Sequence, residues 1–288
     1  MTMDEFSQPD GLQRLSRRDF DRLARFIHGT SGIKMPPSKQ TMVEGRLRRR
    51  LRALGFPTFG DYCQFLFDDG GLDGEATAII DAVTTNKTDF FREPDHFRYL
   101  SETTLPKVIA RSGAGVERPL KVWSAACSTG AEPYTLAMVL SEYARTRSRF
   151  HSAILATDIC TEVLERAALA IYPAAMVDPV PVELRRKYLL RARDPRRGEV
   201  RMAPEIRTMV RFGQLNLMNE TYGLDHDMDV IFCRNLLIYF DKATQQQVLG
   251  RLCEHLRPGG HLFLGHSETI AGLKLPLRQV ATTVFERN

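Results

Sequence analysis

Cysteine is rare in this sequence, and long apolar runs are missing. The 288 residues include 5 cysteines and no C-x-x-C pair, which argues against a zinc site and against a disulfide framework. We therefore expect reduced, mostly buried thiols and no bound metal. Residues 1–11 are polar and acidic, and no apolar run approaches membrane-spanning length, so we expect neither a signal peptide nor a transmembrane helix. The expected location is the cytoplasm, without insertion into a membrane.

Neither sign of charge dominates the chain. The sequence has 40 basic and 35 acidic residues, and the resulting net charge of +5 is too small to indicate nucleic-acid binding, although it favours an acidic partner. The hydrophobic fraction of 43% is sufficient for one large domain or two modest ones with an ample core.

Glycine is scarce in the loop around which the chain is organised. The stretch from Leu120 to Tyr134 predicts a buried strand, a tight loop of small residues and a helix that begins near Pro133. Gly130 is the only glycine of this loop, so neither G-x-G-x-x-G nor the phosphate-loop lysine pattern is present. Glu132 lies at the helix entrance, where it would repel a phosphate. We therefore expect a ligand with positive charge and no phosphate, such as S-adenosylmethionine; a strand-to-helix turn without a ligand is the alternative.

Two further strand ends are predicted to face the same crevice. The strand 152–158 ends in Asp158, which is placed to accept hydrogen bonds from ribose hydroxyls, or alternatively to cap the next helix. The strand 229–232 ends at Cys233, Arg234 and Asn235. Ligands of open α/β sheets bind beyond the carboxyl ends of the strands, so these residues should lie beside the first loop. Further strands are expected at 210–216, at 261–265 and, as the last one, at 280–286.

The first third of the sequence predicts helices only. In the helix expected over 38–54, apolar residues form one stripe and arginines surround the rest: Arg46, Arg48, Arg49, Arg50 and Arg52. A solvated face is the ordinary interpretation of such a charge run, nucleic-acid binding is a second and docking of an acidic protein is a third.

The organisation that follows is an α/β fold with three parts. We expect an all-helical domain over 1–92, a linker helix and loop over 93–119, and a Rossmann-like sheet that binds S-adenosylmethionine over 120–288. Between about 172 and 212 the α/β rhythm is interrupted by prolines, a basic stretch and a turn at 194–198, which together predict a small inserted β subdomain.

Four motifs occur together in this order: T-x-N-x-T-x-F-F-R at 84–92, A-A-C-S-T-G-x-E-P-Y at 125–134, A-T-D at 156–158 and F-C-R-N-x-x-I-Y-F at 232–240. This set resembles the chemotaxis receptor methyltransferase (CheR) family over nearly the whole chain. The basic helix at 46–51 and the insertion at 172–212 resemble the family as well. One departure is Ala131, where the family usually has a glutamate.

The resemblance implies transfer of a methyl group from S-adenosylmethionine to glutamate side chains on the signalling helices of chemotaxis receptors, with S-adenosylhomocysteine as the other product. It implies that the chain acts as a monomer and does not bind nucleic acid. The positions that match cofactor contacts are Asn86, Thr88, Arg92, Glu132, Asp158, Asn216, Leu217, Cys233 and Arg234. Arg92, Arg234 and Tyr239 match catalytic positions, and Arg46, Arg49 and Arg50 match the receptor-docking face.

The expected chemistry needs no catalytic histidine. A glutamate with a pKa of about 4.3 is already ionised at neutral pH, so the reaction requires alignment more than a general base. None of the 7 histidines falls inside the four motifs, and we expect surface or structural roles for them. Two alternatives remain at this point: a nucleic-acid methyltransferase with Cys233 as nucleophile, and a non-catalytic module that binds the cofactor and signals by docking.

Overall fold

The computed structural model describes residues 14–147 and 149–288, and its internal contacts divide the chain into two units, Met1–Thr84 and Thr85–Asn288. The sequence placed this boundary later, at 92. The structure places the boundary after Thr84, because residues 86–92 form hydrogen bonds with the loop and helix that follow β1 (Leu120–Ala125). The carbonyl of Asn86 accepts a hydrogen bond from Ser128 Oγ at 2.8 Å, and the N–H of Phe91 donates to Thr135 Oγ1 at 3.2 Å.

In the described part of the first unit, residues 14–84, the regular elements are all helices. They are α1 (Arg17–Ser31), the short 3-10 helix η1 (Pro37–Lys39), α2 (Gln40–Leu54), α3 (Phe59–Phe67) and α4 (Leu72–Val83). The side chains of Ser16 and Thr58 cap α1 and α3 by accepting N–H bonds three residues later, which satisfies donors that the first helical turn leaves unpaired. The apolar stripes of the four α-helices form a fully buried core that includes Leu23, Ile27, Val43, Leu47, Leu51, Cys63 and Ile79.

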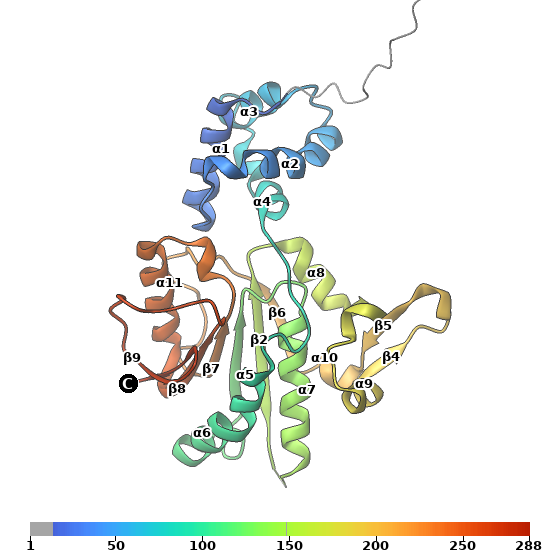
Figure 1. The fold of residues 1–288 in the computed structure, drawn as a ribbon, viewed down its shortest axis with the longest axis vertical. Helices are drawn as coiled ribbons and strands as arrows, with labels where there is room; N and C mark the ends of the chain where they lie inside the picture. Colours follow the sequence, from blue (N-terminus) through green and yellow to red (C-terminus); the bar gives the residue numbers. More distant parts are fainter. Residues whose placement is uncertain (1–13, 148) are drawn as a thin grey trace, which may run out of the picture. The chain divides into compact units, whose positions relative to one another are not determined.

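The second unit is organised around a seven-stranded sheet in the order β6-β2-β1-β7-β8-β10-β9 (Figure 1). Five strands run parallel: β1 (Leu120–Ala125), β2 (Ser152–Asp158), β6 (Val210–Gln214), β7 (Met228–Cys233) and β8 (Leu256–Leu264). Strand β1 pairs with both β2 and β7, so the strand order reverses there. In open α/β sheets the crevice at such a reversal is the ligand site.

The far edge of the sheet differs from the sequence-based expectation. The single last strand expected at 280–286 is wrong, because the structure has two antiparallel strands, β9 (Leu277–Ala281) and β10 (Val284–Arg287). The chain turns between them at Thr283, whose φ of 52° is left-handed and ends the extended run. The two turn residues are Thr282 and Thr283, and threonine is a residue type common in strands, which concealed the turn in the sequence.

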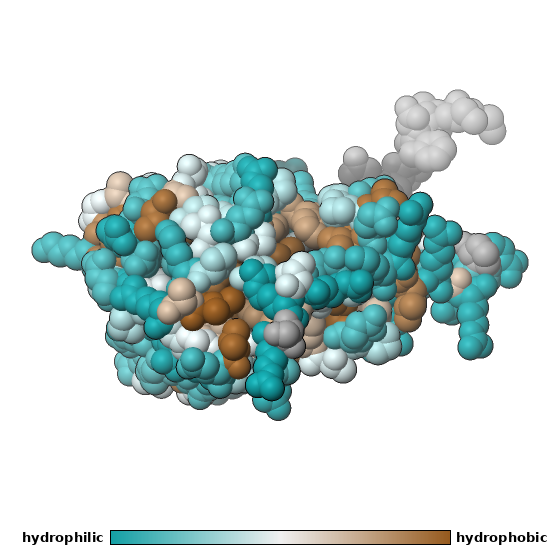
Figure 2. Space-filling model, turned by 90° about the horizontal axis from the view of Figure 1, so that it is seen from below, coloured by the Kyte–Doolittle hydropathy of each residue, from teal (hydrophilic) through white to brown (hydrophobic). Residues whose placement is uncertain are grey.

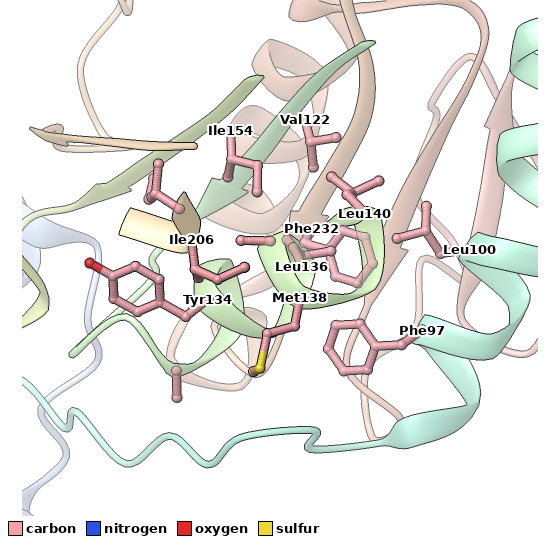
Figure 3. Close-up of a cluster of buried hydrophobic side chains, with 14 of the residues drawn as sticks. Phe97, Leu100, Val122, Tyr134, Leu136, Met138, Leu140, Ile154, Ile206 and Phe232 are labelled. Carbon is pink, nitrogen blue, oxygen red and sulfur yellow. The ribbon is translucent and has the colours of Figure 1, made fainter. Parts of the chain in front are cut away.

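Helices cover the sheet. They are α5 (Pro94–Tyr99), which continues through the π-helix η2 (Leu100–Thr104) into α6 (Leu105–Ser112), then α7 (Ala131–Arg145), α8 (Thr161–Leu169) and α11 (Lys242–His255). Figure 3 shows Phe97 of α5 and Leu136 of α7 in one buried cluster with Val122, Ile154 and Phe232 of the sheet. The loops beyond β1 and β7 are therefore anchored on a rigid core.

A small antiparallel sheet, ordered β3-β5-β4, is inserted between α8 and β6, which confirms the expected subdomain. Its strands are β3 (Ile171–Pro173), β4 (Leu189–Arg191) and β5 (Glu199–Met202), and its helices are η3 (Ala174–Val177), α9 (Val182–Tyr188), η4 (Pro195–Arg197) and α10 (Pro204–Arg207). In Figure 1 its strands lie to one side of the main sheet.

In the part of the chain described, no helix has the length and apolar character needed to span a bilayer. The face shown in Figure 2 is mostly hydrophilic, with small scattered apolar groups.

Candidate cofactor and active site

The loop between β1 and α7 has a conformation that only certain residues tolerate. Gly130 has a φ of 90°, and a Cβ placed there would lie 2.9 Å from Tyr172 Oη and 3.0 Å from the Cβ of Ala167. Ala126 and Ser128 also have left-handed φ values, of 59° and 51°. Strained backbone of this kind persists only where the surroundings hold it, and it concentrates at ligand sites. Here the hydroxyl of Tyr172 donates to the carbonyl of Thr129 at 2.7 Å.

Asp158, at the end of β2, binds this loop directly. Its Oδ2 accepts the N–H of Ser128 at 2.8 Å, and its Oδ1 accepts the N–H of Cys160 at 3.0 Å. The alternative role as a helix N-cap is wrong, because the N-cap residue of α8 is Cys160. These two backbone bonds fix the Asp158 carboxylate at the tip of β2, beside the loop. Because Asp158 occupies the N–H of Ser128, this loop is unsuited to phosphate and suited to a cationic ligand.

Glu132, in the first turn of α7, lies beside Arg234 from the end of β7. Glu132 Oε1 accepts a hydrogen bond from Ser124 Oγ at 2.7 Å, and Oε2 accepts one from Arg234 Nη1 at 3.1 Å. Burial raises the pKa of the Glu132 carboxyl although the guanidinium opposes this shift. The two residues connect the tips of β1 and β7 across the strand reversal.

Arg234 has a second carboxylate partner, Glu93, which lies one residue beyond the motif at 84–92 and was not among the predicted site residues. Arg234 Nη2 lies 2.8 Å from Glu93 Oε2 and also donates to the carbonyl of Arg92. Burial disfavours the charged form of Glu93, but hydrogen bonds and charge from Arg234 more than offset this and lower its pKa to about 2. The Arg234 side chain is only 2% exposed, and its guanidinium carbon lies 5.4 Å from the centre of the Phe97 ring. Arg234 therefore links Glu93 and Glu132 and fixes the positions of both carboxylates in the site.

A third acid, Glu268, shapes the turn after β7. Its carboxylate accepts N–H bonds from Gly265 at 2.6 Å, Leu237 at 2.7 Å and Asn235 at 2.9 Å. Asn235 has a left-handed φ of 58°, which these bonds stabilise. The turn continues into the 3-10 helix η5 (Leu237–Tyr239), so Glu268 sets the course of the chain to Tyr239. The sequence signal for Glu268 was an acid just beyond the end of a strand, as it was for Asp158.

The remaining predicted residues of the second unit lie along the same edge. The side-chain amide of Asn86 donates to Cys160 Sγ at 3.6 Å, and Arg92 Nη1 donates to the carbonyl of Lys87 at 3.4 Å. Asn216 follows β6, and its Oδ1 accepts the N–H of Met218 at 2.9 Å. Thr88, Arg92 and Tyr239 are partly exposed, whereas Leu217 is buried.

Cys233 is completely buried, and burial raises the pKa of its thiol well above the ordinary value. A nucleophilic cysteine needs an accessible thiolate. The alternative interpretation, in which Cys233 attacks a nucleic-acid base, therefore loses the residue on which it rested. A contact between Cys233 and a cofactor would have to involve its backbone.

The arginines of α2 differ in their surroundings within the helical unit. Arg46 Nη1 donates to the carbonyls of Val83 at 2.6 Å and Thr84 at 2.7 Å, where α4 ends. Arg50 Nε donates to Glu75 Oε2 at 2.7 Å, and Glu75 is buried. Arg49 is exposed. Arg46 and Arg50 thus stabilise the unit, whereas Arg49 faces solvent.

The strand order, the constrained loop at the strand reversal and the carboxylates beside it define a class of protein, the S-adenosylmethionine-dependent methyltransferases with a Rossmann-like sheet. Two family models match the chain. Residues 18–84 match the CheR methyltransferase all-alpha domain, and residues 86–285 match the CheR methyltransferase SAM binding domain. The chain therefore belongs to the CheR methyltransferase family, and its cofactor is S-adenosylmethionine.

Curated relatives agree with this assignment. The chain is 41% identical to a chemotaxis protein methyltransferase of Salmonella typhimurium, covering 95% of this chain and 92% of the relative. It is 38% identical to chemotaxis protein methyltransferase 2 of Pseudomonas aeruginosa, covering 94% and 93%. The Escherichia coli chemotaxis protein methyltransferase is 40% identical, with 94% and 91% covered.

Proposed function

We propose that this protein transfers a methyl group from S-adenosylmethionine to glutamate side chains of chemotaxis receptors, giving glutamyl methyl esters during chemosensory adaptation. The observation that carries this proposal is the match of both family domains over residues 18–84 and 86–285, joined to a strand reversal lined by Asp158, Glu132 and Arg234. The protein would act as a monomer in the cytoplasm, on the signalling helices of the receptors.

In this proposal the residues at the strand tips bind and orient. Asp158 accepts hydrogen bonds from ribose hydroxyls, and its bonds to the N–H groups of Ser128 and Cys160 hold the carboxylate in place. Asn86, Thr88, Arg92, Asn216 and Leu217, together with the backbone of Cys233, complete the cofactor contacts. The bound cofactor supplies an electrophilic methyl group on a sulfonium. Arg234 acts as a positioning residue, since its side chain is 2% exposed and is bound to Glu93 and Glu132.

The acceptor requires little acid–base assistance. A receptor glutamate is ionised at neutral pH, with a pKa of about 4.3, so its carboxylate attacks the methyl without prior proton transfer. What the enzyme must provide is an in-line approach, which can account for several kcal/mol of a reaction barrier. Tyr239 is partly exposed at the end of η5, and its hydroxyl could hold this geometry by donating a hydrogen bond at the reacting centre.

The receptor-docking proposal now concentrates on Arg49. Arg46 and Arg50 are partly buried, whereas the side chain of Arg49 is exposed. An exposed charge on a helix face steers encounter with an oppositely charged partner and contributes little to the fold. Arg49 is therefore the member of the trio that we assign to the acidic receptor surface.

Methyl-labelled S-adenosylmethionine and receptor-rich membranes test the proposal. We expect label on the receptor that mild base releases as methanol, the signature of a carboxyl ester. Receptors whose acceptor glutamates are replaced by alanine are the matched control and should take up no label. Label in nucleic acid would support the nucleic-acid alternative, and cofactor binding without any transfer would support the non-catalytic module. Base-stable label on the receptor would show methylation of a side chain other than a carboxylate.

A further inference from the structure

Glu93, the partner of Arg234, also belongs to a cluster of three side chains of types that bind metals. Glu93, His96 and His266 each offer one ligand atom, and these atoms all lie within 4.8 Å of one another. Glu93 is the N-cap residue of α5, and His96 lies in the first turn of that helix. His266 follows the end of β8, and its backbone N–H donates to Glu93 Oε1 at 3.2 Å. The structure thus brings together residues separated by 170 positions.

His96 is oriented as a ligand would be. The residue is 2% exposed, and its Nε2 forms a hydrogen bond with Thr283 Oγ1 at 2.9 Å. Nδ1 has no hydrogen-bond partner and lies 3.5 Å from Glu93 Oε2. A buried ring nitrogen without a partner is costly in a folded protein and calls for an explanation. Metal-binding histidines commonly donate their other ring nitrogen to an oxygen acceptor, as the Thr283 contact allows here.

The donor set matches borderline transition metals. Two imidazoles and one carboxylate with an open position bind Zn²⁺ or Fe²⁺ in many proteins. With bond lengths of about 2.0–2.1 Å, neighbouring ligand atoms of a tetrahedral Zn²⁺ lie about 3.3 Å apart, close to the separation of His96 Nδ1 and Glu93 Oε2. The exposed side chain of His266 can adjust to complete the site.

We propose that Glu93, His96 and His266 form a binding site for a divalent transition metal such as Zn²⁺. The absence of cysteine pairs predicted no metal, but two of these ligands are histidines that lie outside the four motifs. The proposal stands on the geometry of the second unit and is independent of the methyl acceptor.

Occupation of this site has a consequence for the cofactor pocket, and this step rests on the proposed function. Glu93 Oε2 is the atom that holds Arg234, and Arg234 in turn holds Glu132. A metal that takes this oxygen competes with the guanidinium for the same carboxylate. Bound metal should therefore weaken the contacts of Arg234 with Glu93 and Glu132 and lower the affinity for the cofactor. The metal would then act as an inhibitor.

The test uses the full chain, freed of metal with a chelator and titrated with Zn²⁺ by calorimetry. We expect one Zn²⁺ per chain and, for His266→Ala, an affinity lower by at least ~10-fold, as loss of groups at metal sites typically gives. His266 is chosen because its side chain is exposed, so the variant should keep its melting temperature. His151→Ala removes another exposed histidine, at the edge of β2, and should bind Zn²⁺ as the unchanged protein does. With Co²⁺ as the probe, visible d–d absorption should appear and be lost in His266→Ala.

Absence of Zn²⁺ binding, or equal binding by His266→Ala, would overturn the site. The regulatory step is tested separately, by titrating S-adenosylhomocysteine with and without saturating Zn²⁺. A weaker cofactor affinity that appears in the unchanged protein and not in His266→Ala supports competition for Glu93. Unchanged cofactor affinity overturns the competition while leaving the metal site in place, and neither measurement depends on the identity of the methyl acceptor.

Discussion

At the scale of single residues, burial determines which charged groups can contact a ligand. Arg92 and Arg234 both match catalytic positions, but Arg234 has a side chain 2% exposed and two carboxylate partners, whereas Arg92 is partly exposed. A buried guanidinium whose partners are removed leaves an uncompensated charge, which is strongly destabilising. Arg234 therefore acts on the site through the positions of Glu93 and Glu132.

Asp158→Asn should weaken binding of S-adenosylmethionine and S-adenosylhomocysteine by about 1–3 kcal/mol, because a charged acceptor for ribose hydroxyls is lost. Asparagine keeps the shape and one acceptor oxygen, so the contacts to Ser128 and Cys160 are disturbed less than by alanine. Calorimetry measures the affinity, and the melting temperature of the cofactor-free protein reports on the loop. An unchanged affinity in the folded variant would remove Asp158 from the ribose site.

Tyr239→Phe removes one hydroxyl and should separate chemistry from binding. If the hydroxyl acts mainly in the transition state, kcat should fall roughly ten- to a hundredfold, equivalent to about 1–3 kcal/mol, while the cofactor Kd stays nearly constant. Single-turnover methyl transfer and product binding should be measured on the same preparation. Tyr143→Phe is the matched control, because it removes the same single hydroxyl from a buried tyrosine of α7 that lies outside the four motifs. Full single-turnover activity of Tyr239→Phe with a lowered melting temperature would make Tyr239 a structural residue.

At the scale of elements, α2 combines structural and exposed arginines on one helix. Its buried residues, Val43, Leu47 and Leu51, recur at helical spacing and fix which arginines face inward. Arg50 reaches Glu75 on α4, and the hydroxyl of Tyr62 on α3 donates to the same carboxylate at 3.2 Å. The charge run is therefore neither a uniformly solvated face nor a uniform docking face.

Arg49→Glu and Arg50→Glu should change different properties, the receptor kinetics in the first case and the stability of the helical unit in the second. Arg49→Glu should raise the receptor KM and reduce its salt sensitivity, with little change in stability, because exposed charges act on encounter. Arg50→Glu should destabilise the helical unit by about 1–3 kcal/mol, since it leaves two carboxylates facing each other and Glu75 is buried. Hydrogen exchange of the α2 and α4 peptides reports the stability of this unit. Equal receptor kinetics for Arg49→Glu would return Arg49 to an ordinary solvated position.

At the scale of the whole molecule, buried histidines make stability depend on pH. His96 and His261 are buried, and desolvation lowers the pKa of each to about 4. In the unfolded chain a histidine titrates near ~6.5, so between about pH 6.5 and 4 the unfolded state binds protons that the folded state does not. Their neutral forms thus contribute stability that is present above pH ~6.5 and lost as the pH falls through this window.

His261→Phe should flatten this dependence. Both ring nitrogens of His261 are buried without hydrogen-bond partners, so an aromatic ring of similar shape removes the proton-binding difference at little cost. Urea unfolding at pH 7, 6 and 5, followed by the fluorescence of Trp123, the single tryptophan, reports on the second unit. The unchanged protein should lose up to about 1.4 kcal/mol per pH unit for each histidine. A variant with the original slope would show that His261 is not a source of the dependence.

The sequence by itself determined the α/β class, the inserted subdomain and the residues at the strand tips. Local signals are sufficient for these, because apolar periodicity marks the strands and Gly130, Pro133 and Glu132 mark a strand-to-helix turn. The acid at the end of a strand pointed to Asp158 for the same reason.

Tertiary structure decided what each charged residue does. Glu93, Glu268 and His266 lie outside the residues selected from the motifs, yet they surround Arg234 or the turn to Tyr239. Their roles depend on burial and on partners far away in the sequence, such as Glu93 with Arg234, 141 positions apart. The energy of a charge depends on its solvation and its neighbours, which periodicity and spacing along one chain do not encode.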